Sequence, residues 1–233
     1  MRQNKPIKTA KILKRYKRFL ADVELENGEI ITVHTANTGS MKTCWEPGWQ
    51  VIISDSQNTK RKYQYSLELT HNGDTWIGIN TGLANDLAEE VINNGNIEQL
   101  SGYKSLKREK KIGKSRLDIF LSDSESGKKD CFVEVKNVTL KDQLKATFPD
   151  AVSERGQKHL DELINLKNEG HRSCMLYIVQ REDVEEFSPA NKIDPIYTQK
   201  LKEAVEAGVE VYVCQFAVQP DKIEFKRLLP LKL

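Results

Sequence analysis

The most constraining feature of this sequence is a pair of alternating apolar and polar runs at residues 115–122 and 131–138. A Ser-Gly dipeptide at 126–127 lies in the polar loop between them, and this pattern predicts an antiparallel hairpin. A hairpin symmetric about that turn places Asp118 opposite Glu134, with Cβ atoms about 5 Å apart. A bulge in the loop would shift this register.

Two carboxylates this close repel each other, so one of them resists ionisation unless a cation lies between them. Lys136 shares a strand face with Glu134 and can supply one positive charge. A divalent metal, Mg²⁺ or Mn²⁺, suits hard carboxylate oxygens better. An Asp followed by Glu-x-Lys on the next strand resembles the active site of the PD-(D/E)xK nuclease superfamily. The resemblance implies catalytic Asp118, Glu134 and Lys136, with Asp118 and Glu134 as metal ligands; the alternative is an ordinary solvated strand face.

Longer segments of the chain carry a more specific resemblance. They are NTGSM at residues 37–41, RK at 61–62, VEVKNVT at 133–139, FPDAV at 148–152, RGQKHL at 155–160 and VQR at 179–181. In this order they resemble the sugar fermentation stimulation protein family. The resemblance implies a cytoplasmic protein that binds DNA with little sequence preference, built from an OB-like barrel and a nuclease-like domain. It leaves open whether the protein cuts DNA or is a non-enzymatic regulator of sugar (maltose) metabolism.

The first third of the chain predicts a small barrel. Short alternating strands separated by turn residues are expected at residues 19–25, 29–34, 49–54, 63–70 and 75–79. Strands this short and this closely spaced are typical of an OB-like barrel, which we assign to residues 1–81. No helix-turn-helix or dimerising heptad is visible to support the regulator alternative.

The rest of the chain, residues 82–233, alternates between helices and strands. Helices are expected at 83–94, 150–169 and 194–207, and strands at 103–112, 115–122, 131–138, 173–180, 209–218 and 222–228. The order is that of a PD-(D/E)xK nuclease-like mixed sheet, so the fold class is α/β (α+β). A nearly all-apolar run at 173–180 predicts a strand buried on both faces.

Four further residues are predicted to support the carboxylate pair. Glu90 lies at the edge of the apolar stripe of the first helix, and a solvated carboxylate is the alternative there. Arg116 precedes Asp118 in a basic run. Gln157 and Lys158 lie on the helix after the Glu-x-Lys strand, where related nucleases carry a supporting Gln or Lys. His159, beside the apolar stripe, is interpreted as a packed histidine.

The net charge of +2 does not by itself imply a nucleic-acid partner, but the basic residues are clustered. Such clusters suit phosphate contacts, and lysines that protect a strand edge from aggregation are the alternative. The residues predicted to bind DNA are Lys14, Arg15, Lys17, Arg18, Lys60, Arg61, Lys62, Lys107, Arg108 and Arg155.

Several classes of protein are excluded. No apolar run approaches the roughly 18 residues of a membrane span, and the basic N-terminus lacks the apolar segment of a signal peptide. The four cysteines are scattered without a C-x-x-C pair, which favours reduced core thiols in a cytoplasmic protein. The sequence leaves the oligomeric state and the structure of the DNA substrate open.

Overall fold

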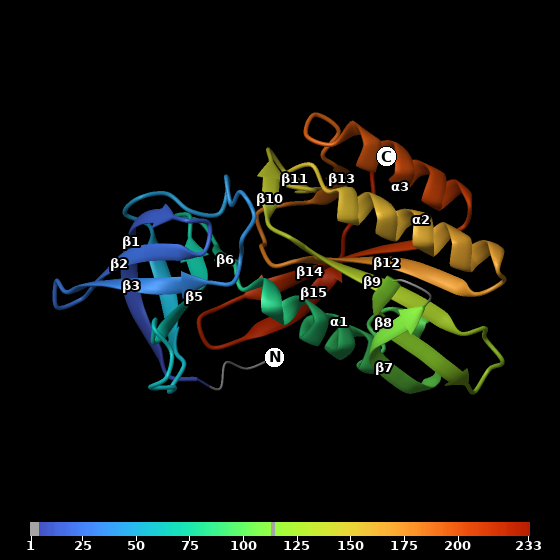
Figure 1. The fold of residues 1–233 in the computed structure, drawn as a ribbon, viewed down its shortest axis with the longest axis horizontal. Helices are drawn as coiled ribbons and strands as arrows, with labels where there is room; N and C mark the ends of the chain where they lie inside the picture. The colour runs from blue at the N-terminus through green and yellow to red at the C-terminus, as the bar shows by residue number, and fades with distance from the viewer. Residues whose placement is uncertain (1–4, 113–114) are drawn as a thin grey trace.

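The computed structural model describes residues 5–112 and 115–233, so the first four residues of the predicted barrel domain lie outside it. Its N-terminal part is a barrel whose sheet has the order β3-β2-β1-β4-β5-β6 and closes through a parallel β3–β5 pairing (Figure 1). The strands are β1 (Ile7–Tyr16), β2 (Leu20–Leu25), β3 (Ile30–Thr35), β4 (Gln50–Asp55), β5 (Tyr65–His71) and β6 (Trp76–Gly78). The predicted OB-like barrel is confirmed.

Strand β1 is the main correction to the predicted barrel. We expected its strands to begin near residue 19, but β1 pairs with both β2 and β4. Its apolar residues Ala10 and Ile12 are buried in the barrel core, whereas Lys11 between them and Lys8 before them are exposed. The dense lysines therefore mask an amphipathic strand that buries one face.

The second part is a mixed sheet with the order β15-β14-β12-β9-β8-β7. Strands β7, β8 and β9 are antiparallel, β9, β12 and β14 are parallel, and β15 returns antiparallel to β14. The strands are β7 (Tyr103–Ile112), β8 (Ser115–Ser124), β9 (Cys131–Val138), β12 (Arg172–Val179), β14 (Glu210–Val218) and β15 (Ile223–Leu228). The predicted mixed sheet is confirmed.

Helices cover both faces of this sheet. Helix α1 (Ala84–Asn93) packs on one face, and α2 (Glu154–Asn168) and α3 (Pro195–Glu206) pack on the other (Figure 1). Short 3₁₀ turns, η1 (Thr81–Leu83) and η2 (Glu98–Leu100), flank α1. No helix within the described residues is both long and apolar enough to cross a lipid bilayer.

Two features of this domain differ from expectation. Strands β10 (Leu140–Asp142), β11 (Lys145–Phe148) and β13 (Glu186–Pro189) form a small separate sheet that was not predicted. Helix α2 begins at Glu154 rather than Asp150, because the Ser153 hydroxyl caps it by accepting the Gly156 N–H at 3.0 Å. The predicted start of α3 is confirmed, with Asp194 as its cap and Pro195 in its first turn.

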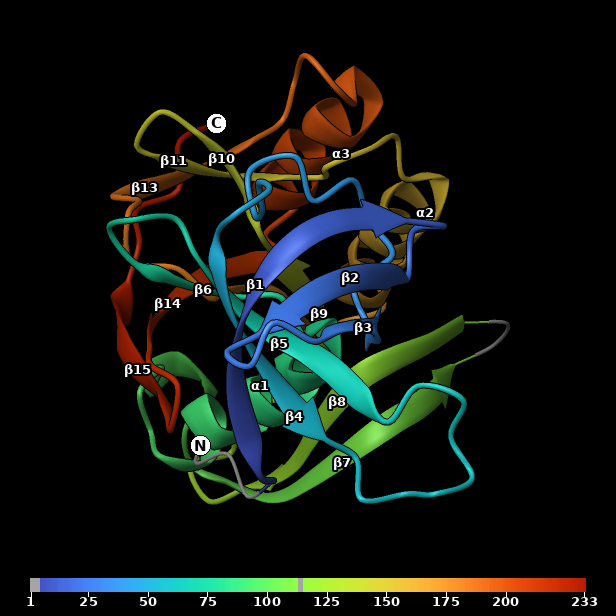
Figure 2. The same cartoon turned by 90° about the vertical axis from the view of Figure 1, so that its left-hand side faces the viewer.

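The two parts of the molecule share a hydrogen-bonded and apolar interface. The guanidinium of Arg181 is 1% exposed and donates to the carbonyls of Thr43 (3.1 Å) in the barrel and Thr139 (2.8 Å) in the sheet domain. The Gly78 N–H donates to the Gln180 carbonyl at 2.8 Å. The barrel and the sheet domain therefore pack as neighbours with a common boundary, as the view from the barrel side also shows (Figure 2).

Candidate metal and nucleic-acid site

The β8–β9 hairpin has the register predicted from its sequence. Ile119 pairs with Val133, and Phe120 pairs with Phe132. One position further the strand ladder ends, and the Asp118 carboxylate takes the place of a backbone acceptor. Its Oδ2 accepts the Val135 N–H at 2.8 Å. Asp118 is thereby held beside the Glu-x-Lys segment of β9.

Asp118 receives a second hydrogen bond from helix α1, where Asn85 Nδ2 donates to its Oδ1 at 3.2 Å. Burial and the negative charge of Glu134 raise the pKa of Asp118, and the two hydrogen bonds oppose this rise. Among residues 5–112 and 115–233, no group of three or more His, Cys, Asp and Glu side chains is placed to hold a metal. The α1 residue that contacts Asp118 is Asn85, and a supporting role for Glu90 stays a prediction.

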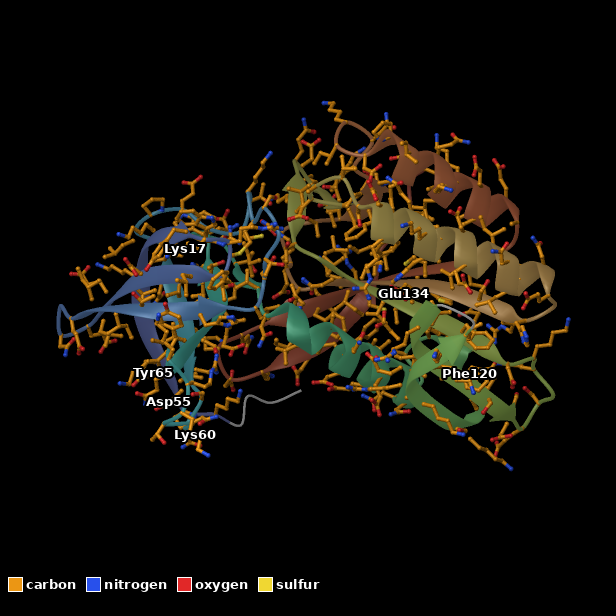
Figure 3. The ribbon with its side chains drawn as sticks, viewed as in Figure 1. Lys17, Asp55, Lys60, Tyr65, Phe120 and Glu134 are labelled. Carbon is orange, nitrogen blue, oxygen red and sulfur yellow. The ribbon has the colours of Figure 1, made fainter. Side chains whose placement is uncertain are left out.

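Glu134 lies at the centre of the molecule (Figure 3), and only 2% of its surface is exposed. Its Oε1 contacts both the Lys136 ammonium and His159 Nδ1. Burial acts to raise its pKa, but the hydrogen bond from His159 and the charge of Lys136 outweigh burial, so the pKa of Glu134 is lowered. Its Oε2 is buried without a hydrogen-bond partner in the described part of the chain. The ionised form of Glu134 is thus favoured, and one oxygen of its carboxylate accepts no hydrogen bond from the described residues.

His159 is buried, as its place beside the apolar stripe predicts, but its ring also contacts the Glu134 carboxylate. It lies on α2, and Arg155 Nε, one turn earlier, approaches its Nε2 at 3.4 Å. Because a guanidinium only donates, Nε2 is the acceptor in this contact, while Nδ1 faces both the Glu134 carboxylate and, at 3.1 Å, the Lys136 ammonium. The i, i+4 spacing of Arg155 and His159 on a helix that packs on β9 was the available signal.

The other predicted supporting residues lie elsewhere. Gln157 donates to both carboxylate oxygens of Asp194, at 3.0 and 3.1 Å, and so links α2 to the start of α3. Lys158 is exposed on α2. Arg116 forms an ion pair with Glu109 at 2.9 Å along the β7–β8 hairpin. Gln157 and Arg116 thus engage carboxylates other than the Asp118–Glu134 pair, and support of that pair by these residues stays a prediction.

Several residues predicted to bind DNA have intramolecular roles. Arg15 donates to the carbonyls of Asn37 (3.0 Å) and Gly39 (2.9 Å), and Arg18 donates to that of Thr38 (2.9 Å), so both hold one barrel loop. The Arg108 guanidinium is likewise occupied within the chain, because it forms ion pairs with the Asp86 and Glu89 carboxylates of α1.

Exposed cations remain in each predicted cluster. They are Lys14, which pairs with Asp22 at 3.2 Å, together with Lys17, Lys60, Lys62 and Lys107. Lys17 and Lys60 lie at opposite ends of the barrel (Figure 3). The barrel therefore presents two separate basic ends.

Replacement of Asp118 by Asn is expected to raise the stability of the metal-free protein. The raised pKa means that ionised Asp118 destabilises the folded state at neutral pH. We expect a gain in unfolding free energy of about 1 kcal/mol at pH 7. The gain should disappear below the ordinary aspartate pKa of 3.8, where the group is protonated in both states. Urea denaturation in EDTA between pH 7 and values below 3.8 measures the gain in stability. The exposed Asp142→Asn is the control, and equal effects of the two substitutions on stability would contradict the prediction.

An OB-like barrel joined to a nuclease-like mixed sheet, with an Asp and a Glu-x-Lys on adjoining strands, defines the class of this protein. Comparison with known families agrees domain by domain. Residues 13–79 match the SfsA N-terminal OB domain, and residues 82–222 match the sugar fermentation stimulation protein RE domain. The chain belongs to the sugar fermentation stimulation protein family.

Curated relatives and a solved structure extend this result over the whole chain. A sugar fermentation stimulation protein homolog of Citrifermentans bemidjiense is 47% identical and covers 100% of both chains. One from Shewanella sp. (strain MR-4) is 48% identical over 97% of both. The structure of Pyrococcus furiosus SfsA in complex with Ca²⁺ matches with a TM-score of 0.89 and 29% identity, covering 100% of this chain and 98% of that one.

Proposed function

We propose that this protein binds DNA with little sequence preference and hydrolyses its phosphodiester bonds with the help of a divalent metal ion. The observation that carries the proposal is the pair Asp118 and Glu134. Two carboxylates from adjoining strands lie close enough for the charge of one to raise the pKa of the other, and Glu134 Oε2 has no hydrogen-bond partner among the described residues. A buried carboxylate oxygen without a partner is costly unless a ligand satisfies it.

The donor set fits Mg²⁺ or Mn²⁺. Both are hard cations that bind through one or two carboxylates and keep several water molecules, so two protein ligands, Asp118 and Glu134, are sufficient. A divalent ion there would also oppose the repulsion between the two charges. The relative from Pyrococcus furiosus was solved in complex with Ca²⁺, another cation that prefers oxygen ligands.

The chain's own side chains have distinct roles in the proposed hydrolysis. A metal held by Asp118 and Glu134 would supply Lewis-acid stabilisation of the charge on the phosphate. Lys136, held against Glu134, orients the attacking water and assists removal of its proton. His159 donates to the same Glu134 oxygen and fixes that carboxylate on the α2 side.

For DNA binding we propose the exposed lysines of the barrel and of the β7–β8 hairpin. The end of the barrel that carries Lys60 and the β7–β8 hairpin with Lys107 lie toward the same side of the molecule (Figures 1, 2 and 3). A nucleic-acid backbone crossing that side would meet cations from both domains. We divide the chain between residues 81 and 82, and we place the protein in the cytoplasm because its four cysteines are free thiols.

Affinity for duplex DNA in EDTA is expected to fall as salt rises, by about 0.9 log units per log unit of salt for each phosphate engaged. Replacing Lys60 and Lys62 together by Gln should lower this slope by about 2. Lys200→Gln, which removes a cation paired with Asp161 on α2, is the matched control and should leave the slope unchanged. Fluorescence anisotropy measures the slopes; a salt-insensitive affinity or a strong preference for one sequence contradicts the proposal.

A non-enzymatic DNA-binding regulator of sugar metabolism is the alternative outcome. It predicts the same salt-dependent binding but no cleavage of duplex, single-stranded or branched DNA with Mg²⁺ or Mn²⁺. Incubation of the purified chain with these substrates, with EDTA as the blank, separates the two functions.

A further inference from the structure

A small cavity lies at the boundary between the barrel and the sheet domain, and the proposed function does not use it. Its volume is about 180 Å³. This is below the roughly 300 Å³ at which pockets for drug-sized ligands begin, so the cavity suits a single ring system. It is lined by residues of both domains, among them Asn37, Gly39, Asn137, Thr147, Phe148 and Asp150.

The cavity exists only because the two domains meet closely there. The Ser40 N–H in the barrel donates to Asp150 Oδ2 at 2.6 Å. A Cβ atom at Gly39 would lie 2.4 Å from the same oxygen, so this approach requires glycine. Arg15 fixes the loop from the barrel side through the carbonyls of Asn37 and Gly39. The walls are therefore built by specific contacts.

The lining has the chemistry of a neutral hydrogen-bonding ligand. Hydroxyl, amide and carboxylate groups predominate, Phe148 adds an aromatic surface, and neither lysine nor arginine lines the cavity. A phosphate would find no cation here, whereas Asp150 can accept hydrogen bonds from amino groups. Thr147 is 6% exposed, and its hydroxyl has no hydrogen-bond partner in the part of the chain that the structure describes. The Thr147 hydroxyl therefore has its hydrogen-bonding capacity left for a ligand.

The position of the cavity connects it to the carboxylate pair. Asn137 directly follows Lys136 on β9, so the cavity begins where the Glu-x-Lys segment ends. The carboxylate pair and the cavity therefore draw on neighbouring residues of one strand.

We propose that this cavity accepts one unpaired nucleobase of the bound DNA, stacked on Phe148 and hydrogen-bonded by Thr147 and Asp150. The proposal rests on the proposed DNA binding and makes its substrate class more specific: DNA with an unpaired base, as in bulges, mismatches or single strands. The free-energy cost of moving a base out of the helix is lowest for a base that is already unpaired, which favours such substrates over intact duplex.

The test compares Thr147→Val with Thr35→Val in the full chain. Both substitutions keep the shape of the side chain and remove a buried hydroxyl without a partner among the described residues, but Thr35 does not line the cavity. The probes are a duplex with one bulged 2-aminopurine and the fully paired duplex, titrated in EDTA by anisotropy and by 2-aminopurine fluorescence.

We expect the wild type to prefer the bulged duplex and to change the 2-aminopurine emission. Thr147→Val should weaken binding of the bulged duplex about three- to tenfold, the range for loss of one hydrogen bond, and should leave binding of the paired duplex unchanged. Thr35→Val should bind both probes as the wild type does. Thermal unfolding of both variants shows that they fold.

Other outcomes overturn the proposal in distinguishable ways. Equal affinity of the wild type for both duplexes, or equal effects of the two substitutions, removes the base site while DNA binding stands. No binding of either duplex removes the proposed function itself. Stabilisation of the wild type by a free monosaccharide, absent in Thr147→Val, would assign the cavity to a sugar instead.

Discussion

Replacement of Glu134 by Gln is expected to lower Mn²⁺-dependent DNA cleavage by at least about 10³-fold. Gln keeps the size of the side chain and its Oε1 can still accept from Lys136 and His159, so only the charge is lost. Metal assistance contributes several kcal/mol to such reactions, and each 1.36 kcal/mol is a factor of ten in rate. Single-turnover cleavage of a labelled duplex, with and without Mn²⁺, measures the loss.

Two controls separate this effect from general damage. Glu182→Gln removes a carboxylate that is paired with Lys226 on the far edge of the sheet, and it should cut at the wild-type rate. Lys136→Ala should bind the metal yet cut poorly, because it removes only the group that orients the water. Cleavage that survives Glu134→Gln shows that the active site lies elsewhere.

Replacement of Arg181 by Met is expected to cost about 3–5 kcal/mol of unfolding free energy. Arg181 is buried, and it pairs with Asp183 at 2.7 Å while it bridges carbonyls of both domains. Removing one partner of a buried ion pair leaves the other charge and several acceptors poorly satisfied. The neighbouring Lys141, at 2.7 Å from Asp183, compensates only part of that charge.

Urea denaturation at pH 7 measures this cost, and Lys226→Met is the matched control. Lys226 also pairs with an acid, at 2.6 Å, but its side chain is exposed, so its loss should change stability by less than about 1 kcal/mol. A similarly small change for Arg181→Met would show that the stability of the contact between the domains does not depend on this guanidinium.

The parts of the fold that depend on local patterns could be predicted from the sequence. Alternation about the turn at 126–127 was enough to pair Ile119 with Val133, because strand register follows from the turn and the apolar face. The cap at Asp194 fixed the start of α3 for the same local reason. Strand β1 was not predicted because only two of its residues, Ala10 and Ile12, are buried, and they lie among many lysines.

The site was less predictable, since it depends on contacts between segments far apart in the chain. The residues around Gln157 do not indicate that it hydrogen-bonds to Asp194. Likewise, the residues around Arg15 do not indicate that it donates to the carbonyls of the 37–39 loop. The chemical type of the carboxylate pair could be read from the hairpin. The partner that completes it, His159, required the packing of α2 on β9.

Mn²⁺ titration followed by electron paramagnetic resonance shows directly whether Asp118 and Glu134 hold a divalent ion, as we propose. The free-ion signal should fall as the wild-type protein takes up one Mn²⁺ per chain. Glu134→Gln and Asp118→Asn should leave the signal of the free ion intact, whereas Glu182→Gln should behave as the wild type. No uptake by the wild type at millimolar Mn²⁺, or undiminished uptake by both site variants, would contradict the claim.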